Sequence, residues 1–272
     1  LPSITVLDEG TGPKRVLRSE VSHAASQDVM FSWDMNMTTK MGGMEVPIDL
    51  PPLQASMTVK TLPETSADKV HYSMTMSQVD FKMSGGDTQN PLLEPMRRDM
   101  QNLSGMVSKG VMRRNGQLLD MDMSAAGASA SMVEQLSGAM SQSFVVFPDV
   151  PVGVGARWSM TEDVEERGMK FQRQTIFEVT ALKGSEVALT LTLGGKPLSK
   201  EIRSPELPPG ATAELVSMSV SGTGTVLYSL TDLFPTKSHI DVQLITEMVM
   251  KHSGQSMDVV SAMGFNFSLT SQ

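Results

Sequence analysis

The sequence has no cysteine, few aromatic residues and no long apolar run, and each absence excludes a class of protein. Without cysteine there are no disulfides, no thiolate metal sites and no cysteine nucleophile. No apolar stretch approaches the roughly 20 residues that a membrane-spanning helix requires, which predicts a soluble chain. The 22 Lys and Arg residues against 30 Asp and Glu residues give a net charge of −8. We therefore expect no nucleic-acid partner, because nucleic-acid affinity rests on cationic contacts with phosphates.

The motifs of common enzymes are missing as well. The sequence contains no nucleophile elbow, no zinc-protease helix motif, no P-loop and no dinucleotide-binding glycine motif. Its four histidines, His23, His71, His239 and His252, form no local cluster. A triad built from distant residues stays open, since triads are recognised by geometry. We predict that the protein is not an enzyme and has no catalytic residues, no cofactor and no metal.

Methionine is unusually frequent, with 24 residues in 272. Three interpretations stay open: a filler of irregular core gaps, a lining for flexible apolar ligands, or thioether ligands for Cu(I). Pairs with the spacing that Cu(I) sites use are Met35 and Met37, Met41 and Met44, Met74 and Met76, Met121 and Met123, and Met248 and Met250. Residues i and i+2 of a strand share a face, so an apolar strand face made of methionine has this spacing too.

Alternation of apolar and polar residues dominates the sequence and predicts strands. In residues 31–41 one face of an extended chain would carry Phe31, Trp33, Met35, Met37 and Met41. Residues 187–193 and 240–250 carry similar stripes. Long strands with one apolar face suit a curved antiparallel sheet. We therefore predict a mainly β fold, in which duplicated curved antiparallel sheets form a barrel-like or clam-like body.

Two segments depart from this alternation and predict short amphipathic helices. The apolar positions are Leu92, Met96, Met100 and Leu103 in residues 91–103, and Ala128, Met132, Leu136, Met140 and Phe144 in residues 128–144. Each helix could bury an open face of the sheet, which is the ordinary way to cover one, or act as a lid over a cavity.

An internal repeat relates the two halves of the sequence. The series Trp33, Met35, Gly43, Met44 recurs with the same spacing as Trp158, Met160, Gly168, Met169. Residues 57–62 match residues 177–182, and the first copy has an additional Pro-rich stretch at residues 47–53. The repeat predicts a first β-rich copy with both helices at residues 1–146, a Pro/Gly linker at 147–157 and a second β-rich copy at 158–272. The two copies could merge into a single domain.

The linker carries a resemblance to known proteins. Residues 147–158 read FPDVPVGVGARW, a Phe-Pro followed by Pro-Val-Gly-Val-Gly and a Trp that opens a strand. This pattern resembles the middle of an uncharacterised family of exported bacterial envelope proteins and lipoproteins. The resemblance implies an exported protein in the periplasm or anchored to the outer membrane, and it implies no catalytic residues. The first residue, Leu1, fits the removal of a signal peptide or lipoprotein leader.

These observations predict a non-enzymatic binding protein that holds an apolar, lipid-like small molecule in a Met-rich interior cavity, with peripheral association to the envelope. The residues expected to line the cavity are Trp33, Met35, Met37, Met96, Met100, Met132, Met140, Trp158 and Met160. Each tryptophan could instead be a buried anchor of its copy's core. Two other functions stay open: a periplasmic Cu(I)-binding protein, and a structural or assembly component of the envelope with an exposed apolar patch or an unpaired sheet edge.

Overall fold

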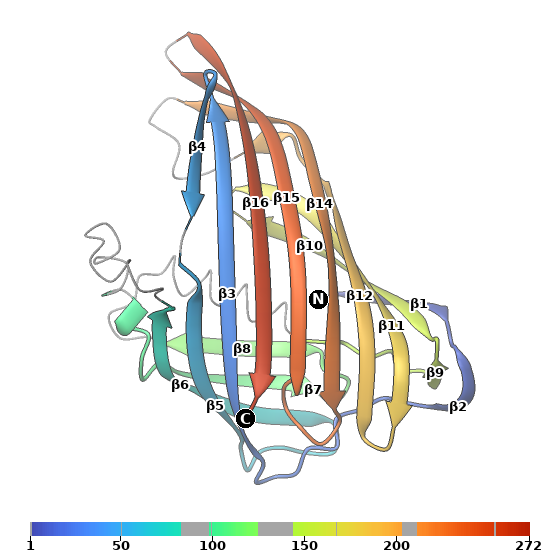
Figure 1. Ribbon diagram of the computed structural model, residues 1–272. Helices are drawn as coiled ribbons and strands as arrows, with labels where there is room; N and C mark the ends of the chain where they lie inside the picture. Colours follow the sequence, from blue (N-terminus) through green and yellow to red (C-terminus); the bar gives the residue numbers. More distant parts are fainter. Residues whose placement is uncertain are drawn as a thin grey trace.

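The computed structural model describes residues 2–49, 51–82, 98, 100–124, 144–166, 168–202, 211–252 and 254–272. The predicted β character is confirmed, because strands account for most of these residues (Figure 1). Period-two burial follows the sequence pattern closely, as in β5 (Leu53–Thr61), where inward and outward side chains alternate along the strand. Alternation of this kind is what one packed face of an antiparallel sheet requires.

One large antiparallel sheet contains almost all of the strands. From edge to edge its order is β1 (Ser3–Asp8), β10 (Arg157–Glu166), β11 (Met169–Lys183), β12 (Glu186–Pro197), β14 (Thr212–Ser229), β15 (Lys237–His252), β16 (Gln255–Ser271), β3 (Ser26–Met41), β5, β6 (Lys69–Phe81), β7 (Val107–Arg113) and β8 (Leu118–Ser124). Two short strands lie beside this path, β4 (Met44–Asp49) on β3 and β13 (Glu201–Ile202) on β14. A separate ribbon pairs β2 (Thr11–Arg15) with β9 (Val152–Val154).

The sheet is strongly curved and open. In Figure 1 the long strands β3, β16, β15 and β14 stand side by side, and the strands that follow at either end turn away from them. The edge strands β1 and β8 do not pair with each other in the described part of the chain, so the sheet does not close into a barrel. The predicted barrel-like or clam-like body is therefore confirmed only as one large curved antiparallel sheet.

The two predicted amphipathic helices are not confirmed. Residues 128–143 lie outside the described residues, as do residues 91–97 and 99. Within the remainder of the first segment, only Arg98, Met100 and Gln101 have helical backbone, and turns follow up to Gly105. Among the described residues no helix is long and apolar enough to cross a membrane.

The repeated series of residues occupies equivalent hairpins in the two halves. Met41 lies opposite Met44 across the turn that joins β3 to β4, and Glu166 lies opposite Met169 across the turn that joins β10 to β11. Gly43 and Gly168 have φ angles of 84° and 78°, a region that residues with a Cβ rarely adopt. The matching glycines of the sequence are therefore the residues that make both turns possible.

The additional Pro-rich stretch divides a strand of the first half in two. In the second half β11 pairs with β10 without interruption, from Met169 to Glu178. In the first half two strands share the same edge of β3, with Asp49 of β4 opposite Asn36 and Leu53 of β5 opposite Trp33. Pro51 and Pro52 lie between them, and proline cannot donate a backbone hydrogen bond to a ladder.

Each half of the sequence completes its part of the sheet with a strand from the other half. β16 comes last in the chain and pairs with β3 over thirteen residue pairs, from Val259 opposite Met41 to Ser271 opposite Val29. β1 comes first and pairs with β10, with Val6 opposite Trp158. The halves thus form one sheet, and the boundary predicted at residues 147–157 stays a prediction.

Two large apolar clusters lie on the packed face of this sheet, one for each half. The first is built on β3, β5 and β6 and includes Phe31, Met57, Tyr72 and Met74. The second is built on β10, β11, β12 and β14 and is centred on Trp158, whose indole stacks on Phe177 with ring centroids 5.5 Å apart. Phe267 of β16 packs against both clusters and so joins them.

Candidate functional site

Cross-strand register places an apolar surface on one face of the central strands. Residues that lie directly opposite one another in an antiparallel pair point to the same side of the sheet. Three successive rows across β3, β16 and β15 are Trp33, Phe267 and Ile240; Met35, Phe265 and Val242; and Met37, Met263 and Leu244. We call the half-buried members of these rows the apolar strip: Trp33, Met35, Met37, Phe265, Phe267, Val242 and Leu244.

Toward the upper strand ends of Figure 1, half-buried and exposed apolar residues of this face are mixed with buried ones such as Met263 and Val259. Phe31 and Leu269 form the row below Trp33 and are buried. The strip itself is half-buried, and the indole of Trp33 stacks on Phe265 with centroids 6.3 Å apart. At the strand ends Met44 is 68% exposed. The face therefore offers apolar surface that the described residues leave partly open to solvent.

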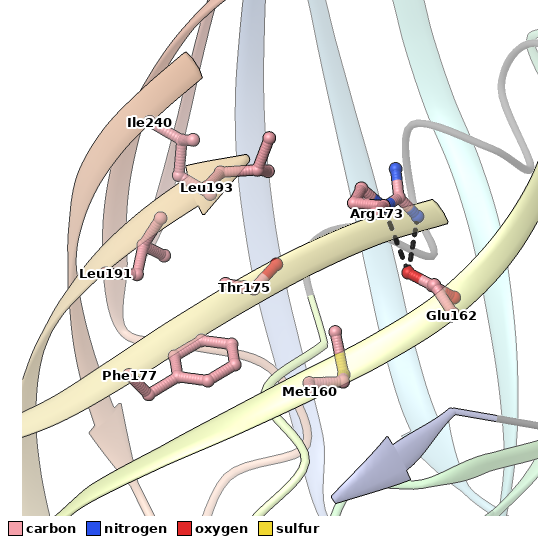
Figure 2. Close-up of a pocket in the computed structure, with 8 residues that line it drawn as sticks. All are labelled: Met160, Glu162, Arg173, Thr175, Phe177, Leu191, Leu193 and Ile240. Carbon is pink, nitrogen blue, oxygen red and sulfur yellow. Dashed lines mark hydrogen bonds and ion pairs between the residues drawn. The ribbon is translucent and has the colours of Figure 1, made fainter. Parts of the chain in front are cut away.

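The strip continues across β14 to a small pocket on β10, β11 and β12. Ile240 lies opposite Gly224, which lies opposite Leu191 of β12. A Cβ on Gly224 would lie 2.7 Å from the carbonyl oxygen of His239, so this position has room only for glycine. Because glycine has no side chain, Ile240 and Leu191 line the same pocket on either side of it (Figure 2).

The pocket has a mainly apolar lining with a charged pair at one end. Its lining residues are Met160, Glu162, Arg173, Thr175, Phe177, Leu191, Leu193 and Ile240. The free space inside it is about 30 Å³, which holds about one water molecule. Ligand pockets usually enclose about 300–1,000 Å³. The pocket as it stands is therefore too small for a ligand such as an acyl chain.

The charged pair consists of Arg173 and Glu162, which are direct cross-strand neighbours on β11 and β10. The Arg173 guanidinium donates from Nε and Nη2 to the same carboxylate oxygen, Glu162 Oε1, at 3.0 and 2.7 Å (Figure 2). The side chains are 10% and 27% exposed. Charge-assisted hydrogen bonds of this length are among the stronger polar contacts in proteins.

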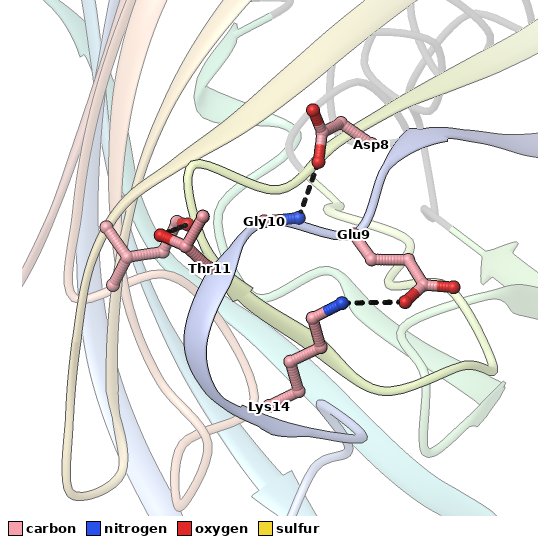
Figure 3. A network of polar contacts seen from close by, with 6 residues as sticks. Asp8, Glu9, Gly10, Thr11 and Lys14 are labelled. Carbon is pink, nitrogen blue, oxygen red and sulfur yellow. Dashed lines mark hydrogen bonds and ion pairs between the residues drawn. The ribbon is translucent and has the colours of Figure 1, made fainter.

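A second polar cluster lies near the N-terminus, away from this face. The backbone N–H of Gly10 donates to Asp8 Oδ1 at 2.7 Å, and Lys14 Nζ lies 2.8 Å from Glu9 Oε2 (Figure 3). Both side chains of the ion pair are exposed, and exposed pairs contribute little to stability. These contacts lie in the segment that joins β1 to β2.

Five of the predicted lining residues fall on one side of the sheet, and they have different environments. Trp33, Met35 and Met37 belong to the apolar strip, and Met160 lines the pocket. Trp158 is fully buried, and its Nε1–H donates to the carbonyl oxygen of Val146 at 2.9 Å. In this structure Trp158 is thus a core anchor, one of the two roles that the sequence left open.

The other predicted residues came from the helical segments. Met100 is half-buried and packs against the first cluster. Met96, Met132 and Met140 lie outside the described residues.

Sequence reasoning missed several members of the site. Phe265 and Phe267 reach it only because β16 pairs with β3, a contact between the two ends of the chain. Arg173 did leave a signal, since it interrupts the apolar alternation between Met169 and Phe177. A charge within an otherwise apolar strand face marks a position that has a partner or a function.

Comparisons with known proteins identify no family. No protein-family model matches the chain, and no curated protein matches it. The crystal structure of Pseudomonas aeruginosa OccK11 (OpdR) is 6% identical, over 91% of this chain and 96% of that chain, with a TM-score of 0.22. That of Pseudomonas aeruginosa OccK8 (OprE) is 8% identical, over 91% and 98%, with a TM-score of 0.15. Similarities of this size support no inference about function.

Proposed function

We propose that the protein is a non-enzymatic binding protein that holds a lipid-like apolar molecule along the apolar strip. The observation that carries the proposal is the half-buried group of Trp33, Met35 and Phe265, which adjoins the buried row of Phe31 and Leu269 on the same face. An acyl chain laid on the apolar strip would gain roughly 25 cal/mol for each Å² of apolar surface removed from water, before the cost of ordering the chain. Methionine suits such a surface because its flexible side chain adapts to ligands of different shape.

The proposed location is the bacterial cell envelope. The support for it is the resemblance of residues 147–158 to exported envelope proteins and lipoproteins. Within this segment Phe147 packs against Trp158 and Tyr228, with ring centroids 6.1 and 5.5 Å apart. The motif therefore has a packing role in the second core, and the ligand surface lies elsewhere on the sheet.

The proposal can be tested by contact quenching, because the chain has only two tryptophans. A fatty acid brominated along its chain quenches an indole that it touches. In Trp158→Phe, where Trp33 is the remaining fluorophore, we expect the brominated acid to quench most of the emission in a saturable titration. In Trp33→Phe we expect little quenching, since Trp158 is fully buried.

An unbrominated acid of equal length is the control, and it should displace the brominated one and restore the emission. Equal quenching of both tryptophans would show unspecific binding or unfolding and would contradict the proposed site. Absence of saturable quenching in Trp158→Phe would contradict binding on the strip.

Cu(I) binding remains a second candidate, and a specific arrangement favours it. Met41 lies opposite Met44, and Met257 lies opposite Met250. Met41 also lies opposite Val259 of β16, and Met257 precedes Val259 by two residues, so Met257 lies on the same face as Met41. Three of these four side chains are exposed. Thioethers are soft ligands that suit Cu(I). Among the described residues no group of three or more His, Asp or Glu forms an alternative metal site.

If this candidate is correct, Cu(I) competed against a chelator under anaerobic conditions should bind at the strand ends. Replacing Met41, Met44 and Met257 together by Leu should weaken binding at least about ten-fold, the loss of one or more metal ligands. The matched control is Met35→Leu with Met37→Leu, which changes the same residue type in the same strand outside this group. Equal Cu(I) affinity in wild type and both variants would exclude the strand-end site.

A further inference from the structure

We propose that Met250, Met257 and His252, beside the turn that joins β15 to β16, form a Cu(I) site with two thioether ligands and one imidazole ligand. The inference rests on Cu(I) binding, the second candidate function. It replaces a group made of methionine alone by a ligand set that includes a histidine.

Cross-strand register brings the three side chains to one face of the β15–β16 hairpin, at the upper end of these strands in Figure 1. Met250 lies directly opposite Met257, and His252 lies opposite Gln255 in the last pair before the turn. Residues two apart on a strand share a face, so His252 shares the face of both methionines. Opposite residues have Cβ atoms about 4.5–5.5 Å apart, and diagonal neighbours such as His252 and Met257 are within reach of long side chains. The two sulfur atoms and one ring nitrogen can therefore converge on a single ion.

The other histidines in the strands do not meet this condition. His71 is three residues from the nearest methionine of β6, so the two side chains lie on opposite faces. His239 is already held, with Nδ1 3.0 Å from Ser268 Oγ and Nε2 3.1 Å from Asp241 Oδ2. The imidazole of His252 is exposed, and no residue in the described part of the chain forms a hydrogen bond or ion pair with it. It is therefore free to bind a metal.

The ligand types favour Cu(I) over harder ions. Thioethers select Cu(I) and imidazole also suits copper, whereas carboxylates suit Mg²⁺ and Ca²⁺. The chain has no cysteine, so methionine supplies its only sulfur ligands. The charged residues of this hairpin end, Lys251 and Asp258, alternate with the three ligands along the strands and therefore point to the other face. The ligand face of the hairpin end thus carries no carboxylate.

The burial of the three side chains combines a fixed ligand with an open approach. Met257 is 41% exposed, and His252 is exposed as well. Met250 is half-buried and packs against a third apolar cluster, which consists of Met169, Ile202, Ala213 and Leu215. An ion can therefore reach the site from solvent without opening the sheet, while the packing of Met250 keeps one sulfur atom in place.

The test is a Cu(I) titration of the whole chain against a chromophoric chelator under anaerobic conditions. His252→Phe should weaken Cu(I) binding at least about ten-fold, because a residue that contacts the metal contributes no less than the outer partners whose loss costs 10–100-fold. Met250→Leu and Met257→Leu should each weaken binding to a similar extent. Zn(II), offered to wild type in place of Cu(I), should bind more weakly by at least the same factor, since two of the three ligands are thioethers.

Matched controls come from the same strands and residue types. His239→Phe removes the other exposed histidine of β15, and Met35→Leu with Met37→Leu removes a methionine pair of β3. Neither change should alter the Cu(I) affinity. X-ray absorption of the Cu(I)-loaded protein should show an imidazole nitrogen together with sulfur in wild type, and sulfur without imidazole in His252→Phe.

The outcomes separate this site from Cu(I) binding in general. If His252→Phe binds Cu(I) as tightly as wild type, while the joint replacement of Met41, Met44 and Met257 weakens binding, the inference is wrong and the second candidate function stands. If wild type does not compete with the chelator at all, both are wrong and the lipid-binding proposal is unaffected. Equal losses in His252→Phe and His239→Phe would also contradict a site at the hairpin.

Discussion

Replacing Trp158 by alanine is expected to lower the free energy of unfolding by about 3–5 kcal/mol, the usual loss for a large aromatic side chain in a packed core. Trp158 is fully buried, stacks on Phe177 and donates its indole N–H to the Val146 carbonyl oxygen. The substitution removes all of these contacts at once and leaves a cavity that the surrounding strands cannot fill by small shifts.

The matched variant is Trp33→Ala, at the repeat-equivalent position. Trp33 is half-buried and stacks on Phe265 at the edge of the packed region. We expect this substitution to cost about 1–2 kcal/mol, since less apolar surface is lost and water can fill the space. Urea denaturation of both variants, followed by far-ultraviolet circular dichroism, measures the two losses. Equal losses would show that Trp33 is packed as closely as Trp158, which would contradict the apolar strip as an open surface.

Stability is expected to fall steeply as the pH rises above 10. The chain has two tyrosines, Tyr72 and Tyr228, and both are buried. Burial raises the pKa of the Tyr72 phenol well above its usual value of 10.0, and the nearby Asp120 charge adds to the effect. Burial likewise raises the pKa of Tyr228, with a further contribution from Asp232.

The direction of this change in stability follows from which state, folded or unfolded, holds the phenolic protons. Above pH 10 the unfolded chain releases both phenolic protons and the folded protein keeps them, so the unfolded state binds fewer protons and a rise in pH favours it. Each tyrosine then contributes a loss of about 1.4 kcal/mol per pH unit. Below pH 10 both states hold these protons, and the two phenols make no contribution to the pH dependence. Tyrosinate absorbance after a pH jump should therefore appear only as fast as the protein unfolds.

Two variants separate the tyrosines. Tyr228→Phe should cost about 1 kcal/mol at neutral pH, because the Tyr228 hydroxyl donates to the Leu233 carbonyl oxygen at 3.1 Å. Tyr72→Phe should be neutral or stabilising, because the Tyr72 hydroxyl has no hydrogen-bond partner among the described residues. Each variant should halve the slope above pH 10. Tyrosinate absorbance that develops immediately, with the circular dichroism unchanged, would show that the phenols are accessible in the folded protein.

Local sequence patterns predicted the strands of this fold and the equivalence of its two halves. Alternating apolar residues placed Phe31, Trp33 and Met35 on one face of a strand, where the structure has them. The repeat also matched Gly43 with Gly168, and both occupy hairpin turns with positive φ, which is a local requirement. Such features depend on neighbouring residues alone, so they can be predicted from the sequence of a short segment.

Those local patterns do not predict which distant strands pair with each other. Nothing in residues 255–271 indicates that they pair with residues 26–41, since any strand with a suitable apolar face could occupy that edge. The apolar strip was predicted only in part for the same reason: Trp33, Met35 and Met37 were placed on one strand face, and Phe265 was not. The difference in burial between Trp33 and Trp158 could not be predicted either, because it depends on the contacts of Val146 and Phe147 with Trp158.

Because β16, the last strand of the chain, pairs with β3 of the first half, the sheet cannot be completed until synthesis of the chain has ended. A ribosome synthesises β3 early, yet its neighbour β16 follows only after every strand of the second half. During synthesis one edge of β3 therefore carries unpaired N–H and C=O groups beside an apolar face, a combination that invites pairing with other chains. If the protein crosses a membrane before folding, as export in an unfolded state requires, the delay is useful, because an incomplete sheet stays competent for translocation. Until β16 is made, that edge of β3 is the part of the sheet most open to pairing with another chain.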